Sequence, residues 1–343
     1  MKTALVISFL CAALGVACAT AAQEGPAPAT KKPKLAFVTN CVAEFWTIAT
    51  FGVEAAKKDF DVDATVLMPP KNTVTEQKQF LEDLLAKGVD GIALSPIDPG
   101  NMTALLDKVG QSTLLITHDS DAPKSKRLCY VGMDNYAAGR MCGKLIVEAT
   151  QPGPIVLLVG NLDQDNSRRR RQGIIDELFG RTNDPTRFDP QGAKLKEAGW
   201  EIRATFTDQT DRVKGKAAAQ DALARWTDLV CMVGLFEYEP PLILDAVKSA
   251  NRLGKVAMVA FDENPVTLQG ILDGQIHGTV VQNPYDYGYR SLELLSKLVR
   301  AKDAAARTAL LPKDGFLDVP ARMIRKADAE AFWKDLKQKT GKK

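Results

Sequence analysis

Short apolar runs alternate with segments of helical periodicity along most of the chain. In the segment 75–87, for example, Phe80, Leu81 and Leu84 fall on one face of a helix, which Gly88 ends. Strands and helices that alternate in this way form parallel sheets with helices on both faces. The elements expected in the first half are strands at 35–39, 64–68, 91–95, 113–117 and 128–135 and helices at 43–60, 75–87 and 101–109.

The same alternation begins again at Tyr136 and continues to Val281. Two successive sets of βα units predict two lobes of one architecture. The expected fold class is therefore α/β, with two doubly wound parallel-sheet lobes joined by a three-strand hinge. The elements expected in the second set are helices at 136–149, from about 167, at 212–225 and at 240–250, and strands at 154–160, 201–207, 229–236, 256–261 and 278–281.

The chain is expected to cross between the lobes three times. Pro284 ends the last of these strands, and the following helix, 285–299, is expected to return to the first lobe. The other crossings are expected near Met133 and within 311–315. The first lobe is predicted to comprise residues 34–133 and 283–312, and the second lobe residues 134–282 and 313–325. Within the second lobe, residues 180–199 are expected to form a surface loop. Residues 326–343 are expected to form a C-terminal tail with a surface helix and a frayed end.

Polar side chains stand where two of the predicted strands end. Asp262 follows the apolar run 256–261, and Gln282 follows the short strand 278–281. Ligands of open α/β sheets bind outside the carboxyl ends of the strands, so both side chains are candidates for contact with a small polar ligand. The alternative for Asp262 is a purely structural role as the cap of the helix that begins near Pro265.

The first 22 residues have the pattern of an export signal. Lys2 precedes an apolar core, 4–16, that is too short to span a membrane, and small residues at 19–21 offer a cleavage site. A periplasmic location is therefore expected. Cys18 offers an alternative, a lipid anchor, although Gly15 stands where such signals usually have leucine. Residues 23–33 form a Pro/Ala-rich linker.

Composition and motifs exclude several classes of function. The chain has 343 residues, 45% of them apolar, and a net charge of +3, which is too small to indicate nucleic-acid binding. The cysteines lack CxxC spacing, so no metal site is expected. The chain has no GxSxG, no P-loop and no GxGxxG after a strand, so we expect neither a catalytic residue nor a cofactor. His118 beside Asp119 suggests acid–base chemistry, but no nucleophile is patterned with it.

Several short motifs occur in one order along the chain: VTNCVAEFW, ALSPIDP, ITHDSD, GMDNYAAGR, an Arg-rich segment ending in RRQGI, FTDQTDRVKG, VAFDENP and TVVQNP. Together they resemble the periplasmic sugar-binding proteins of the ribose-binding type. These type I periplasmic binding proteins share their fold with the ligand-binding cores of lac-repressor-type regulators. The resemblance spans about 34–325, and it implies two lobes that close over a sugar.

The resemblance also implies which residues contact the ligand. The two adjacent aromatic residues that sandwich the sugar ring in the family correspond to Phe45 and Trp46, although both could instead belong to the apolar core. The acid of the first lobe corresponds to Asp119, with Asp121 as the alternative. Within the run 168–171, the sugar-binding arginine corresponds to Arg170, and the other arginines are expected to be mostly solvated. The acid and the glutamine of the second lobe correspond to Asp262 and Gln282.

Three positions depart from the ribose pattern. The third aromatic of the family falls on Thr210, and its asparagine after the strand 229–236 falls near Leu235 and Phe236. Its first-loop asparagine is displaced, which leaves Ala43 at that position and Asn40 earlier in the chain. Phe236 is expected to take over part of the stacking. The expected ligand is therefore a monosaccharide or polyol: a ribose-like pentose, a hexose or a polyol.

The expected function is that of a periplasmic receptor, a monomer, that delivers a sugar to the permease of an ABC importer. A sugar-sensing subunit that presents its ligand to a membrane receptor would have the same binding lobes. An α/β enzyme would need a catalytic motif, and this chain has none of those named above. A transcription regulator would need an N-terminal DNA-binding module, and the predicted signal peptide occupies that place.

Overall fold

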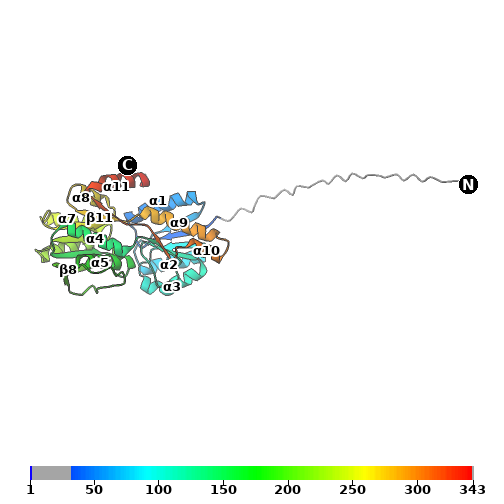
Figure 1. Cartoon of the computed structure of the whole chain (residues 1–343), viewed down its shortest axis with the longest axis horizontal. Coiled ribbons are helices and arrows are strands. Elements are labelled where there is room, and N and C mark those ends of the chain that lie inside the picture. The colour runs from blue at the N-terminus through cyan, green and yellow to red at the C-terminus, as the bar shows by residue number, and fades with distance from the viewer. Residues whose placement is uncertain (2–31, 342–343) are drawn as a thin grey trace. The chain divides into compact units, whose positions relative to one another are not determined.

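The computed structural model describes Met1 and residues 32–341 (Figure 1). Residues 2–22 of the predicted signal peptide, which include Cys18, and most of the predicted linker lie outside the described residues. Among the residues that the structure does describe, no helix is long and apolar enough to cross a membrane. The alternation of apolar runs and helical segments is confirmed as two sheets, each covered by helices on both faces.

Six parallel strands form the sheet of the first lobe, in the order β12-β5-β4-β3-β1-β2. Helices α1 and α9 pack on one face of this sheet, and α2 and α3 pack on the other. The bounds are β1 (Lys34–Val38), α1 (Glu44–Asp59), β2 (Asp63–Leu67), α2 (Val74–Ala86), β3 (Gly91–Leu94), α3 (Pro99–Ser112), β4 (Leu114–His118), β5 (Tyr130–Gly132), α9 (Pro284–Arg300), α10 (Ala304–Leu310) and β12 (Phe316–Asp318).

Seven strands form the sheet of the second lobe, in the order β13-β11-β10-β9-β6-β8-β7, with antiparallel strands at both edges. Helices α4 and α5 cover one face, and α6, α7 and α8 cover the other. The bounds are α4 (Asn135–Ala149), β6 (Pro154–Val159), α5 (Asp165–Leu178), β7 (Leu195–Glu197), β8 (Trp200–Thr207), α6 (Arg212–Arg225), β9 (Cys231–Gly234), α7 (Glu239–Ser249), β10 (Ala257–Phe261), α8 (Pro265–Leu272), β11 (Gly278–Val281), β13 (Arg322–Arg325) and α11 (Lys326–Thr340).

The third crossing between the lobes lies further along the chain than predicted. The chain passes from the first sheet to the second after β5 and returns after β11. The predicted crossing at 311–315 is wrong, because β12 still belongs to the first lobe, where Phe316 pairs with Tyr130 and the Val319 N–H donates to the Gly132 carbonyl at 2.7 Å. The chain reaches the second sheet only at β13. The second lobe therefore does not include the whole of 313–325.

A pair of glycines brings α4 and α5 into close contact. A Cβ atom added at Gly139 would lie 2.2 Å from the Arg170 carbonyl oxygen, and one added at Gly173 would lie 2.2 Å from the Tyr136 carbonyl oxygen. Side chains at either position would push the two helices apart. This contact fixes the position of α5 in the second lobe, and α5 carries the arginine run.

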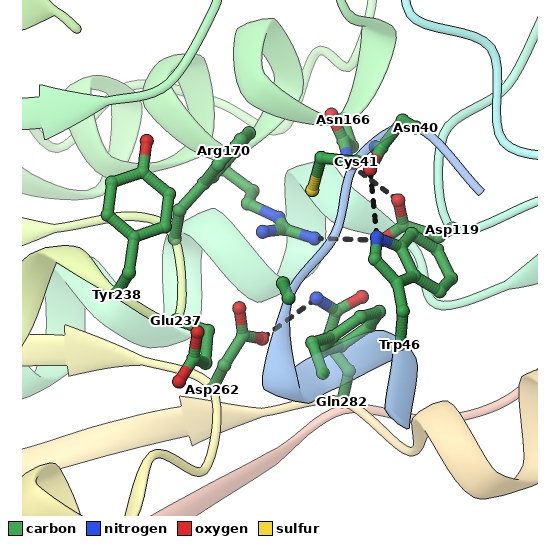
Figure 2. A pocket seen from close by; sticks show the side chains of 13 residues that line it. Asn40, Cys41, Trp46, Asp119, Asn166, Arg170, Glu237, Tyr238, Asp262 and Gln282 are labelled. Atoms are coloured by element: carbon green, nitrogen blue, oxygen red, sulfur yellow. Dashed lines mark hydrogen bonds and ion pairs between the residues drawn. The ribbon is translucent and has the colours of Figure 1, made fainter. Parts of the chain in front are cut away.

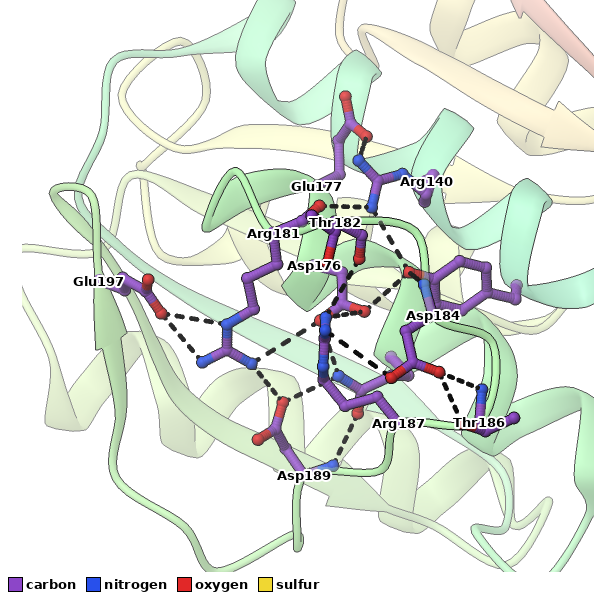
Figure 3. Close-up of polar contacts among 12 residues, drawn as sticks. Arg140, Asp176, Glu177, Arg181, Thr182, Asp184, Thr186, Arg187, Asp189 and Glu197 are labelled. Atoms are coloured by element: carbon purple, nitrogen blue, oxygen red, sulfur yellow. Dashed lines mark hydrogen bonds and ion pairs between the residues drawn. The ribbon is translucent and has the colours of Figure 1, made fainter.

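The predicted surface loop at 180–199 is attached to the second lobe by an ionic network (Figure 3). The Asp176 carboxylate is fully buried, and it accepts hydrogen bonds from the Tyr136 hydroxyl at 2.7 Å and from the Gln172 amide at 2.9 Å. Arg187 pairs with Asp176 at 2.9 Å, and Arg181 pairs with Asp189 at 2.7 Å. The loop also contains a short strand, β7, that the sequence analysis missed.

Candidate functional site

A cavity of about 370 Å³, including its mouth, lies between the carboxyl ends of the two sheets (Figure 2). Residues of both lobes line the cavity, and all seven predicted site residues are among them. The lining residues are Asn40, Cys41, Ala43, Phe45, Trp46, Asp119, Asn166, Arg170, Phe236, Glu237, Tyr238, Asp262 and Gln282.

Asp262 stands at the end of β10 with a left-handed backbone, φ 66°. Its N–H donates to the Val280 carbonyl at 2.8 Å, and its carboxylate accepts a hydrogen bond from the Gln282 amide at 2.8 Å. The cap of α8 is Asn264, whose side chain accepts a hydrogen bond from the Val266 N–H at 2.8 Å. The alternative interpretation of Asp262 as a helix cap is therefore wrong.

Gln282 is held by the hinge. Its side-chain oxygen accepts a hydrogen bond from the Tyr287 hydroxyl at 2.9 Å, which directs its NH₂ group towards Asp262. The same Tyr287 hydroxyl accepts a hydrogen bond from the Met133 N–H at 3.2 Å. Tyr287 thus connects two of the three crossings, and a side chain that lines the cavity is coupled to the geometry of the hinge.

Asp119 joins the two lobes inside the cavity. It follows β4, also with a left-handed backbone, φ 58°. Its carboxylate accepts hydrogen bonds from Ser95 of the first lobe at 3.0 Å and from Asn166 of the second lobe at 3.2 Å. Asp121, the alternative acid, forms an ion pair with Arg127 at 2.6 Å and does not line the cavity.

Arg170 lies opposite Asp119, with its Nη2 atom 3.6 Å from a carboxylate oxygen. Its Nε donates to Asn135 at 2.9 Å and its Nη1 donates to the Leu235 carbonyl at 3.0 Å. These contacts fix the guanidinium, while Nη2 is buried without a hydrogen-bond acceptor among the described residues. A donor that is fixed and unsatisfied in this way suits a polar ligand.

The arginine run is more buried than predicted. Arg168 and Arg169 are partly exposed, but Arg171 is fully buried, so the expectation that most of the run is solvated is wrong at this position. The Arg171 guanidinium donates to the Thr205 hydroxyl at 2.9 Å and to the Asp189 carbonyl at 2.7 Å. It is buried because the loop after α5 folds back over the helix.

The aromatic side chains meet the cavity in a different arrangement from the predicted one. The rings of Phe45 and Trp46 are 4.8 Å apart and perpendicular, at 88°. At most one of them can therefore lie flat against a sugar ring. Trp46 is only 2% exposed and belongs to the core, and it also lines the cavity. Phe236 of the second lobe lies beside Arg170, with its ring centre 5.8 Å from the guanidinium carbon.

Six lining residues were not predicted as contacts: Asn40, Cys41, Ala43, Asn166, Glu237 and Tyr238. Asn166 stands four residues before Arg170 on α5, so the helical repeat placed both on one face. Glu237 and Tyr238 follow β9, and the rule that ligands bind at the carboxyl ends of strands could have found them. Asn40 follows β1 and accepts a hydrogen bond from the Trp46 indole N–H at 2.9 Å.

The cavity contains three carboxyl groups and one guanidinium. Burial raises the pKa of Asp119, against the effect of Arg170, and it raises the pKa of Asp262 to about 7. Burial also raises the pKa of Glu237, whose carboxylate accepts a hydrogen bond from Asn264. The cavity therefore offers many hydrogen-bond acceptors and few donors, which suits a neutral ligand rich in hydroxyl groups.

The histidine and the cysteines that could suggest acid–base or thiol chemistry have structural roles. His118 is fully buried and stacks on Phe37 at 4.0 Å, and burial lowers the pKa of its imidazole to about 3. Such a histidine stays neutral and does not act as an acid or a base near pH 7. Cys129 and Cys231 are buried free thiols. Among residues 32–341, no group of three metal-ligating side chains could hold a metal ion.

Comparison with known proteins identifies the family. Residues 36–303 match the periplasmic binding protein domain. The chain belongs to this family. It is 22% identical to the D-ribose/D-allose-binding protein of Pseudomonas aeruginosa over 310 residues, which are 86% of this chain and 89% of that protein. The family assignment agrees with the resemblance that the motifs indicated.

Two solved structures share the fold. An ABC transporter solute-binding protein of Burkholderia graminis, in complex with D-arabinose, superposes with a TM-score of 0.76 at 24% identity, over 86% of this chain and 96% of that chain. GanP, a glucose-galactose binding protein of Geobacillus stearothermophilus, also has a TM-score of 0.76 at 24% identity, over 87% of this chain and 99% of its own. The predicted two-lobed α/β fold is confirmed.

Proposed function

We propose that this chain binds a monosaccharide or polyol between its lobes and delivers it to an ABC importer. The observation that carries the proposal is the cavity itself, where Asp119, Arg170 and Asp262 converge from both lobes on one space beside an aromatic wall. Carboxylates accept hydrogen bonds from sugar hydroxyls, a guanidinium donates them, and aromatic rings pack against the C–H faces of a sugar. No covalent step is required.

The relatives support the class of ligand. Their names specify ribose or allose, arabinose, and glucose or galactose, so monosaccharides of different size occupy the same fold. In this chain Thr210 and Ala43 stand at two positions where the ribose pattern has an aromatic ring and an asparagine. We infer a pentose, a hexose or a polyol. We further infer that the first 22 residues direct export to the periplasm, and that the protein acts there as a monomer.

A thermal-shift screen over pentoses, hexoses and polyols tests this function. A sugar at about one hundred times its dissociation constant should stabilise the protein by about 2.7 kcal/mol. Because the contacts are divided between the lobes, the same sugar should favour a closed form and reduce the radius of gyration measured by small-angle scattering. If no compound of the three classes raises the melting temperature, the proposed function is wrong.

The affinity for the sugar is expected to rise between about pH 5.5 and about pH 8. Burial raises the pKa of Asp262 to about 7, and the nearby carboxyl groups of Asp119 and Glu237 act in the same direction, against Arg170. A sugar hydroxyl that donates to Asp262 favours the ionised form, so binding below about pH 7 must release a proton. Calorimetry in buffers of different ionisation enthalpy measures this proton. A constant affinity with no proton released would contradict the role of Asp262 as an acceptor.

A further inference from the structure

Two loops outside the cavity join the lobes directly. Asn72 lies between β2 and α2 of the first lobe, and Gln209 and Thr210 lie between β8 and α6 of the second. The Asn72 side-chain NH₂ group donates to the Thr210 hydroxyl and, at 3.4 Å, to the Gln209 carbonyl. None of the three residues lines the cavity.

The order of the strands places this contact far from the hinge. In the first sheet β2 is the edge strand opposite β12 and β5, which lead into the hinge. In the second sheet β8 lies next to the edge that is opposite β13 and β11. A contact between the loops that follow β2 and β8 therefore joins the lobes where a hinge rotation would separate them most.

Both loops hold their contact residues in a fixed conformation. Asn72, Gln209 and Thr210 all have left-handed backbones, with φ of 52°, 58° and 59°. This conformation is unfavourable for a β-branched residue such as threonine, so the surrounding contacts must impose it. The Asn72 N–H donates to the Pro69 carbonyl at 3.2 Å, and the Gln209 N–H donates to the Gly160 carbonyl at 2.7 Å.

The loop of the second lobe is coupled to the cavity wall. The Asp208 carboxylate accepts hydrogen bonds from the Thr210 N–H at 2.8 Å and from the Tyr238 hydroxyl at 2.6 Å, and Tyr238 lines the cavity. A Cβ atom added at Gly160 would lie 2.6 Å from the Phe236 ring and 3.0 Å from the Thr210 methyl group. Thr210 is therefore positioned by the same residues that support the ligand-facing side chains.

We propose that Asn72 and Thr210 form a latch that stabilises the closed form and thereby sets how long a ligand stays bound. The latch rests on the proposed function, because it acts on the closure that encloses the sugar. Residues that favour the closed form raise the apparent affinity without touching the ligand. Since the contact forms after encounter, its loss acts mainly on the dissociation rate.

The variants Asn72→Gly and Thr210→Val test the latch. Glycine keeps the left-handed backbone without the side chain, and valine keeps the shape of threonine without the hydroxyl. Each variant should raise both the dissociation constant and the dissociation rate for the sugar about threefold to tenfold, the range of one hydrogen bond. The double variant should be no weaker than either single variant. Asn251→Gly, at another left-handed asparagine that is exposed at the end of α7, is the control.

Unchanged binding in both variants, or effects that add in the double variant, would overturn the latch. A cysteine pair, Asn72→Cys with Thr210→Cys, tests the approach of the loops without any sugar. Mild oxidation should form a disulfide between these two cysteines. The control pair, Asn72→Cys with Asn251→Cys, should stay reduced. The single variants show whether either new cysteine forms a disulfide with Cys41 instead. A pair that stays reduced contradicts the latch. If no sugar binds but the pair forms, the proposed function fails and the latch stands as a contact between the lobes.

Discussion

Asp262→Asn is expected to abolish tight sugar binding while leaving the protein at least as stable as the parent. The carboxylate accepts one hydrogen bond from Gln282 and lines the cavity, where a sugar hydroxyl would donate to it. Asparagine replaces an acceptor oxygen by an NH₂ group, and the loss of a hydrogen bond to a charged group costs about 1.5–3 kcal/mol, or roughly 10- to 200-fold in affinity. Calorimetry with the sugar found in the screen measures this loss.

The stability of the same variant should depend on pH. The pKa of Asp262 is raised by burial to about 7 in the folded state, above its ordinary value, so the parent loses stability as the pH rises through about 7. Asparagine removes this charge and tolerates the left-handed backbone. Asp262→Asn should therefore melt higher than the parent at about pH 8 and similarly at about pH 4. Asp273→Asn, at an exposed acid of the same lobe, is the control, and a weaker fold with unchanged affinity would contradict both expectations.

The sequence predicted the fold because each strand and helix has its own local pattern. Asp262 and Gln282 were predicted to line the ligand site for the same reason. Each follows an apolar run that forms a strand, and the carboxyl ends of such strands face the ligand site. The third crossing was misplaced because β12 and β13 are two short strands only three residues apart. The local pattern of these two strands does not indicate that Phe316 pairs with β5 of the first lobe and Met323 with β11 of the second.

The burial of the arginine run could not be predicted from the run itself. Arg170 and Arg171 are adjacent and both buried, but Arg170 faces the cavity while Arg171 is covered by the loop that folds back over α5. The contact between Asn72 and Thr210 likewise joins residues 138 positions apart, from two lobes. Such features depend on tertiary contacts, which leave no periodic signal in the sequence.

Asp119→Ala, in contrast to Asp262→Asn, is expected to remove sugar binding and also to weaken the fold. Asp119 is 3% exposed, and its partner Arg170 is 1% exposed. Removal of the acid takes the ion-pair partner away from a buried guanidinium, and breaking a buried ion pair from one side typically costs about 3–5 kcal/mol. Ser95 and Asn166 would also lose their shared acceptor. Urea unfolding should show a lower midpoint, and calorimetry should show no binding.

A double variant separates the two effects. Asp119→Asn with Arg170→Gln removes both charges and keeps hydrogen-bonding groups at both positions. The unfolding midpoint should then recover most of the loss seen in Asp119→Ala, because the guanidinium that had lost its ion-pair partner is itself removed. Sugar binding should not recover, since both the charged acceptor and the fixed guanidinium donor are gone. A double variant that binds the sugar as the parent does would show that Asp119 and Arg170 support the fold and do not contact the ligand.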